Sequence, residues 1–223
     1  LFGPTLVSNN VTEGSVFGRS FRSVTLTFSE AIDQASFGQT AVQLIDGNSS
    51  AINPGNIQFR RDGKQVQLTF AEQVPGAYTL RINQAQVKDL AGNAMGATSL
   101  DTHFTIKQFS VEWINPAGGN WATAANWSAG IVPIATDDVF IPVTSSPVVI
   151  SSGTVTIQTL ISNGPLTLSG GTLTLNGDSQ INGVFTQSGF STVTGPGKLI
   201  LAGPFALVAG TMIGTGQTIL QGI

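Results

Sequence analysis

The sequence of 223 residues predicts an all-β fold, in which a β-sandwich is followed by a right-handed parallel β-helix (solenoid) with an N-terminal cap. Three observations support this prediction. Short runs that alternate apolar with polar residues are bounded by Gly, Pro, Asn and Ser, as strands are. No stretch of useful length has the helical period. The C-terminal part repeats itself with a period near 20 residues, which is typical of stacked coils.

The charged residues are unevenly distributed and so indicate the domains. Residues 1–107 carry 16 of the 21 charged residues, whereas residues 148–223 carry two. All three tryptophans lie between these segments. We therefore predict a sandwich in residues 1–107, a Trp-rich linker that caps the solenoid in residues 108–147, and solenoid coils in residues 148–223. The sequence stops within a repeat, so we expect a C-terminally truncated solenoid from a longer protein.

Residues 1–107 follow the two-residue period of a sheet with one buried face. Val24, Leu26 and Phe28 share a face in one of these runs. Asp62-Gly63 separates two others and predicts a tight hairpin, because Gly accepts the positive φ of such a turn. About seven strands in a segment of this length are typical of a β-sandwich.

Four motifs in this segment resemble bacterial Ig-like domains of the S-layer type, and they come in the order of that family. They are Val24–Asp33, Asp62–Lys64, Gly76–Leu80 and Val87–Met95. The resemblance implies an Ig-like spacer in a multidomain exported protein, and it brings no catalytic residues.

The tryptophans of residues 108–147 are candidates for either a cap or a ligand site. Trp113, Trp121 and Trp127 alternate with Gly and Asn, and this pattern resembles the cap-like segment that precedes β-helical repeats in large bacterial adhesin-like proteins. The first coil of a solenoid exposes an apolar section, which large rings cover well. Alternatively, Trp121, Trp127 and Asn126 form an exposed sugar-binding platform.

The repeats predict which residues of the solenoid stack. Phe185 and Phe205 occupy equivalent positions one repeat apart, and Leu173, Val193 and Met212 form another such set. Because each coil buries its apolar row against its neighbours, we expect these side chains to form columns in the core.

Polar residues that could bind calcium or catalyse a reaction are scattered. Glu30, Asp33, Asp89 and Asn93 are oxygen donors, but without the spacing of a calcium loop we expect them to shape turns. We predict no cofactor, although calcium stays open. His103 is out of phase with its apolar neighbours and is expected to face solvent.

The solenoid segment is equally poor in catalytic groups. Polysaccharide-active β-helices need clustered carboxylates or basic residues. Residues 148–223 contain one acidic and one basic residue, Asp178 and Lys198, and cysteine is absent from the whole chain. We therefore predict that the chain is not an enzyme.

The composition of the chain argues against some classes of binding partner. The net charge of −3 and the absence of a basic patch argue against nucleic-acid binding, and no apolar run is long enough for a membrane span. We predict a structural or adhesive segment of an extracellular or cell-surface bacterial protein. It would act as a rigid spacer or a self-associating module, with other domains of its chain, solenoid ends or surface glycans as partners.

Three alternatives stay open. The first is a carbohydrate-binding module that uses Trp121 and Trp127. The second is a non-catalytic portion of a polysaccharide-active enzyme. The third is ice binding, because Thr-x-Thr triplets at Thr154, Thr172 and Thr192 recur on successive coils until Thr211-Met212-Ile213 breaks the pattern.

Overall fold

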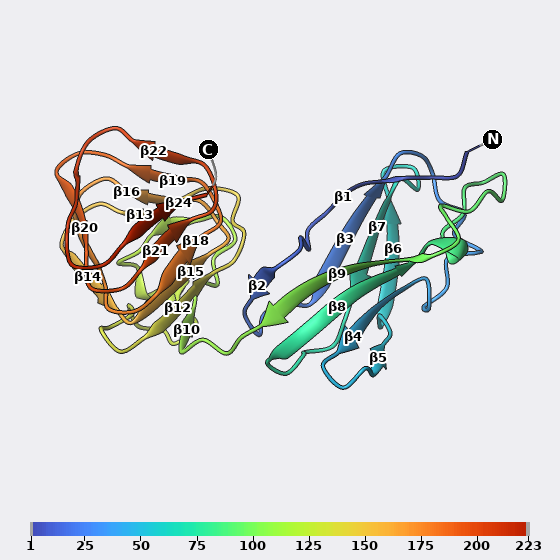
Figure 1. The fold of residues 1–223 in the computed structure, drawn as a ribbon, viewed down its shortest axis with the longest axis horizontal. Coiled ribbons are helices and arrows are strands. Elements are labelled where there is room, and N and C mark those ends of the chain that lie inside the picture. Colours follow the sequence, from blue (N-terminus) through green and yellow to red (C-terminus); the bar gives the residue numbers. More distant parts are fainter. Residues whose placement is uncertain (1, 222–223) are drawn as a thin grey trace. The chain divides into compact units, whose positions relative to one another are not determined.

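The computed structural model describes residues 2–221, and the β-strands in this range are accompanied by two short 3-10 helices, Gln84–Gln86 and Ala124–Asn126, with no α-helix. The described residues fall into two compact units that divide after Gln108 (Figure 1). Each unit is described by itself below.

The N-terminal unit consists of two sheets. The first has the strand order β1-β3-β7-β6 and the second has the order β2-β9-β8-β4-β5. All pairings are antiparallel except that of β2 with β9. The strands are β1 (Leu6–Asn9), β2 (Ser15–Phe17), β3 (Ser23–Phe28), β4 (Val42–Asp46), β5 (Ala51–Ile52), β6 (Asn56–Arg60), β7 (Gln65–Thr69), β8 (Gly76–Asn83) and β9 (Ser99–Ile106).

The core of this unit lies between the two sheets. In β3, Val24, Leu26 and Phe28 are buried and alternate with half-buried Thr and Ser, as the sequence predicts. The predicted hairpin joins β6 to β7, but its turn is longer than a two-residue turn. The chain takes positive φ at Arg61 and Asp62 as well as at Gly63, where φ is 83°.

The C-terminal unit is a parallel solenoid with three sheets, and each complete coil has one strand in each sheet (Figure 1). We name the sheets by their first strands. The β10 sheet comprises β10 (Val111–Glu112), β12 (Asp138–Ile141), β15 (Thr159–Ser162), β18 (Ser179–Ile181), β21 (Leu199–Leu201) and β24 (Thr218–Leu220). The β11 sheet comprises β11 (Gly119–Asn120), β13 (Val148–Ile150), β16 (Leu166–Leu168), β19 (Phe185–Gln187) and β22 (Phe205–Leu207). The β14 sheet comprises β14 (Thr154–Ile157), β17 (Gly171–Leu175), β20 (Ser191–Thr194) and β23 (Thr211–Met212).

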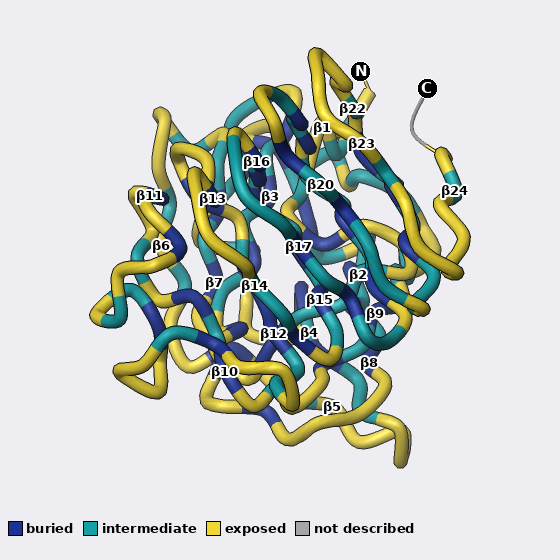
Figure 2. Tube along the Cα trace, turned by 90° about the vertical axis from the view of Figure 1, so that its left-hand side faces the viewer, coloured by how far each residue is buried: buried dark blue, intermediate teal, exposed yellow. Residues whose placement is uncertain are grey.

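The predicted stacking is confirmed. Phe185 pairs with Phe205, and their rings stack with centroids 5.5 Å apart. Leu173 pairs with Val193, and Val193 pairs with Met212. Every strand pairing in this unit is parallel, and the buried apolar residues form one cluster. Figure 2 shows that buried residues alternate with less buried ones along these strands.

The solenoid begins before the residues that the sequence assigned to its coils. Strands β10, β11 and β12 lie within residues 108–147, and they pair in parallel with the strands of the next coil. The segment therefore supplies the strands of the first coil. Two-residue strands such as Val111–Glu112 are too short for the alternation of apolar residues to reveal them.

Gln187 is a buried polar side chain in an otherwise apolar column of the solenoid, as Ser162 is in another column. Gln187 follows Ile150 and Leu168 in register and is fully buried. Its Nε2 donates to the carbonyl oxygens of Ser191 and Thr211 at 3.3 Å and 2.9 Å. These bonds tie a side chain of one coil to the backbone of its own coil and of the next.

Candidate functional site

The three tryptophans form one cluster. Trp113 and Trp127 face each other across an isolated antiparallel bridge, and their ring centroids are 4.8 Å apart in an edge-to-face arrangement. Trp121 packs against Trp127 at 4.6 Å. All three residues are at most 2% exposed and belong to the buried cluster of the solenoid.

Two of the indole N–H groups are hydrogen-bonded to nearby backbone. Trp127 donates to the carbonyl oxygen of Trp121 at 2.8 Å, and Trp113 donates to that of Asn115 at 2.6 Å. The Nε1 of Trp121 has no partner within residues 2–221. Asn126 accepts a bond from Asn115 and donates to the carbonyl oxygen of Asn120, so its amide joins the loops around the rings.

This geometry corrects one sequence-based expectation. A sugar-binding platform needs exposed ring faces, but Trp121 and Trp127 are each 1% exposed. The exposed-platform alternative on these two rings is therefore wrong for this conformation. Sequence reasoning could not separate the two roles, because the same Trp and Asn pattern serves both.

Three of the four candidate calcium ligands, Asp33, Asp89 and Asn93, form hydrogen bonds within turns. The Asp89 carboxylate accepts bonds from the backbone N–H groups of Ala91 and Asn93 and from the side chain of Asn93. The Asn93 amide and these backbone donors hold the pKa of Asp89 below its usual value. Asp33 accepts a bond from the N–H of Ala35. No group of three or more His, Asp or Glu side chains able to hold a metal occurs in residues 2–221.

Other ionisable side chains singled out by the sequence form surface pairs. His103 is exposed, as predicted, and its Nδ1 lies 3.1 Å from Glu13. Asp178 lies 3.5 Å from the Nζ of Lys198 and accepts a bond from its backbone N–H, which lowers the pKa of Asp178. These two residues of adjacent coils therefore bridge one corner of the solenoid.

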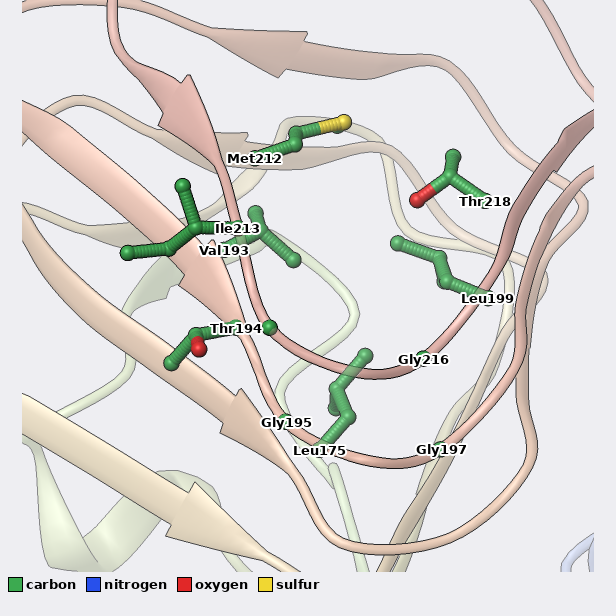
Figure 3. A pocket seen from close by; sticks show the side chains of 11 residues that line it. Leu175, Val193, Thr194, Gly195, Gly197, Leu199, Met212, Ile213, Gly216 and Thr218 are labelled. Atoms are coloured by element: carbon green, nitrogen blue, oxygen red, sulfur yellow. The ribbon is translucent and has the colours of Figure 1, made fainter.

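Three hollows in the described part of the chain are candidate ligand sites. The one in Figure 3 lies at a corner of the solenoid beside Val193, Leu199 and Met212 and has a volume of about 90 Å³. A second, beside Tyr78 and His103, measures about 220 Å³. Both are smaller than the roughly 300 Å³ at which small-molecule pockets usually begin. The third, beside Phe190, measures about 350 Å³ and was not anticipated from the sequence.

The threonines of the β14 sheet stand in register. Thr154, Thr172, Thr192 and Thr211 form one column, and the hydroxyls of the last two lie 3.2 Å apart. This arrangement matches the repeat of Thr-x-Thr triplets in the sequence. Whether the face binds ice stays a prediction.

No helix among the residues that the structure describes has the length and apolar character needed to cross a membrane. A search among curated proteins found no match to this chain. Its residues 3–106 match the family model of the bacterial Ig-like domain.

Solved structures resemble about half of the chain, and only distantly. CopC from Methylosinus trichosporium OB3b is 14% identical with a TM-score of 0.37, and the match covers 47% of this chain and 94% of CopC. Domains 1–6 of the surface layer protein SbsC are 19% identical with a TM-score of 0.35, covering 47% of this chain and 14% of that one. PcoC, a methionine-rich copper resistance protein from Escherichia coli, is 17% identical with a TM-score of 0.36, covering 47% and 98%.

These likenesses are too weak to carry an argument about ligands. The family match and the strand pattern are sufficient to assign the fold of each unit. Residues 3–106 are a bacterial Ig-like domain, and a β-solenoid of about four turns follows it in the chain.

Proposed function

We propose that the chain is a structural segment of a bacterial cell-surface or secreted protein, in which each unit serves as a stiff spacer. The observation that carries this proposal is the unbroken parallel pairing of successive coils in all three sheets of the solenoid. Each coil buries its apolar row against its neighbours, so a coil cannot be displaced without exposing core residues.

The local chemistry favours a passive mechanical role. Most buried side chains of the solenoid are apolar, and the tryptophan cluster would close the core beside the first coil. The candidate acid–base residues Asp178 and Lys198 pair with each other, and His103 pairs with Glu13. A non-catalytic role accounts for each of these pairs.

Mechanical unfolding tests the spacer role. Single molecules held at both ends should show little extension under load and then two separate ruptures, one for each unit. Gradual extension of the solenoid without a rupture would contradict a stiff spacer. Turnover of a polysaccharide by the purified chain would contradict the non-catalytic assignment.

Self-association is the second role to test, because the sequence composition offers little charge repulsion between solenoids. Residues 148–223 contain only Asp178 and Lys198 as charged residues. Sedimentation at increasing concentration should distinguish a passive spacer, which stays monomeric, from a self-associating module, whose mass rises.

A further inference from the structure

One corner of the solenoid is longer than its equivalents. The corner between the β11 sheet and the β14 sheet occurs in four successive coils. Register pairs define its ends as Ile150 and Thr154, Leu168 and Thr172, Gln187 and Thr192, and Leu207 and Thr211. Three residues lie between the ends in the first, second and fourth corners, whereas four lie between Gln187 and Thr192.

The additional residue directs an aromatic ring into solvent. Gly189 takes a φ of 62°, and the next residue, Phe190, is 104% exposed. The neighbouring Thr192 returns to the register of its column. Extra residues in strands commonly bend the chain locally and aim one side chain in a new direction. Here the insertion, in the turn between β19 and β20 (Figure 1), displays Phe190 without disturbing the stack.

A hollow of about 350 Å³ lies beside this ring. Its wall consists of Gly189, Phe190, Ser191, Thr192, Ala209, Gly210 and Thr211. The hydroxyls of Thr192 and Thr211 are 3.2 Å apart and can each donate or accept. The buried hydroxyl of Ser191 has no partner within residues 2–221. None of the residues in this wall is charged.

We propose that this corner, which we call the Phe190 corner, binds a neutral sugar ring. An exposed aromatic face can pack against the C–H face of a pyranose, and the paired threonine hydroxyls match the hydroxyls at its edge. Gly189 and Gly210 have no side chains that would block the approach of a flat ring to Phe190. A wall without charge favours a neutral sugar over an acidic one. The volume lies within the range of small-molecule sites.

The proposal is independent of the spacer role and relocates carbohydrate binding from the buried tryptophans to an exposed ring. The test is saturation-transfer NMR on the full chain with three probes, namely maltohexaose, cellohexaose and, as an acidic counterpart, oligogalacturonate. At least one neutral probe should receive saturation. Phe190→Ala should weaken its binding roughly threefold to tenfold, as expected for one lost ring contact, whereas Phe190→Tyr should retain it.

Two controls make the result specific. Phe2→Ala removes another exposed ring, in the N-terminal unit, and should leave binding unchanged. Thr192→Val keeps the shape but removes a hydroxyl and should weaken binding. Because Phe190 is fully exposed, its alanine variant should unfold at the temperature of the parent chain.

Three results of the binding experiment would overturn the proposal. The first is the absence of signal with both neutral probes, and the second is equal binding by Phe190→Ala. The third is a preference for oligogalacturonate over the neutral sugars. If sedimentation instead reveals a dimer that Phe190→Ala dissociates while sugars remain inert, the ring serves protein contact and the sugar assignment is wrong.

Discussion

The two units reach stability by different means. The Ig-like unit encloses one core between two sheets and places eight acidic and eight basic residues around it. Several of these are paired across strands, as Arg81 and Asp101 are at 2.7 Å. The solenoid instead extends one narrow core from coil to coil, and its polar side chains are mostly uncharged. Ser162, for example, donates to the carbonyl oxygen of Gly164.

This difference determines how strongly a substitution should destabilise each unit. A sandwich can lose an exposed contact with little effect elsewhere, because its core is enclosed on both sides. In a solenoid, the position of each coil depends on direct backbone contact with the one before it. Loss of the closing cluster or of close packing at a corner should therefore affect many residues at once.

The largest effect is expected at the closing cluster. Trp127→Ala removes a buried ring that contacts both other tryptophans, and it should destabilise the solenoid by about 4 kcal/mol. All three tryptophans lie in the C-terminal unit, so tryptophan fluorescence during urea unfolding reports on that unit alone. The ring NMR signals of Tyr78, the chain's one tyrosine, report on the other and should not shift their midpoint.

Trp127→Phe is the matched variant. It keeps a ring in the cluster but removes the hydrogen bond to Trp121, so its loss of stability should be clearly smaller than that of the alanine variant. If Trp127→Ala unfolds at the parent urea concentration, the cluster does not close the core in the way we describe.

A somewhat smaller effect is expected at a corner where coils approach closely. A Cβ on Gly197 would lie 2.1 Å from the carbonyl oxygen of Gly177 in the preceding coil. Gly197→Ala must push these coils apart and should cost about 3 kcal/mol. Gly38→Ala in the Ig-like unit is the control, because a Cβ there meets nothing within 4 Å. If Gly197→Ala lowers the midpoint of the solenoid no more than Gly38→Ala lowers that of the Ig-like unit, close packing at this corner does not matter for stability.

The parts of the fold that could be predicted from the sequence are those whose residue pattern recurs along the chain. Phe185 and Phe205 could be paired because the residues around them also repeat. The first coil was missed because strands such as Gly119–Asn120 have too few residues for a period. The sequence does hint at the longer Phe190 corner, because the repeat length changes between 20 and 19 residues. Only the register of neighbouring strands shows where the extra residue lies.

The roles of the tryptophans depended on information that is absent from a local pattern. Trp121 and Trp127 each follow an asparagine, and this pattern suits either a cap or a binding platform. The N–H of Trp121 donates to the carbonyl oxygen of Val149 in strand β13, a segment that is distant in the sequence. Long-range approach of this kind does not leave a period in the sequence.

Acid should lower the stability of the Ig-like unit moderately more than that of the solenoid. Hydrogen bonds hold the pKa values of Glu13, Glu72, Asp89 and Asp101 below their usual values in the Ig-like unit, and they do the same for Asp178 in the solenoid. A lowered pKa stabilises the fold above the unfolded pKa, and this contribution is lost as the pH falls towards the folded pKa.

Between about pH 5 and pH 3, the midpoint of the Ig-like unit should therefore fall more than that of the solenoid. Urea unfolding at several pH values, followed by the Tyr78 ring signals and by tryptophan fluorescence, measures both midpoints in one sample. Asp101→Asn should reduce the pH dependence of the Ig-like unit, because it removes the carboxylate bound by Arg81. Equal acid sensitivity of the two units would show that the distribution of paired carboxylates does not control it.

The smallest effect is expected from calcium. The Asp89 carboxylate is already occupied by Ala91 and Asn93, and no cluster of acidic side chains accompanies it within residues 2–221. Binding to the folded state alone would raise stability with ligand concentration. We expect the unfolding temperature to be the same in calcium and in chelator, with Asp89→Asn lowering it equally in both. A rise with calcium that Asp89→Asn abolishes would mean that the turn opens to bind the ion, and that the Ig-like unit gains stability from a ligand which the solenoid does not need.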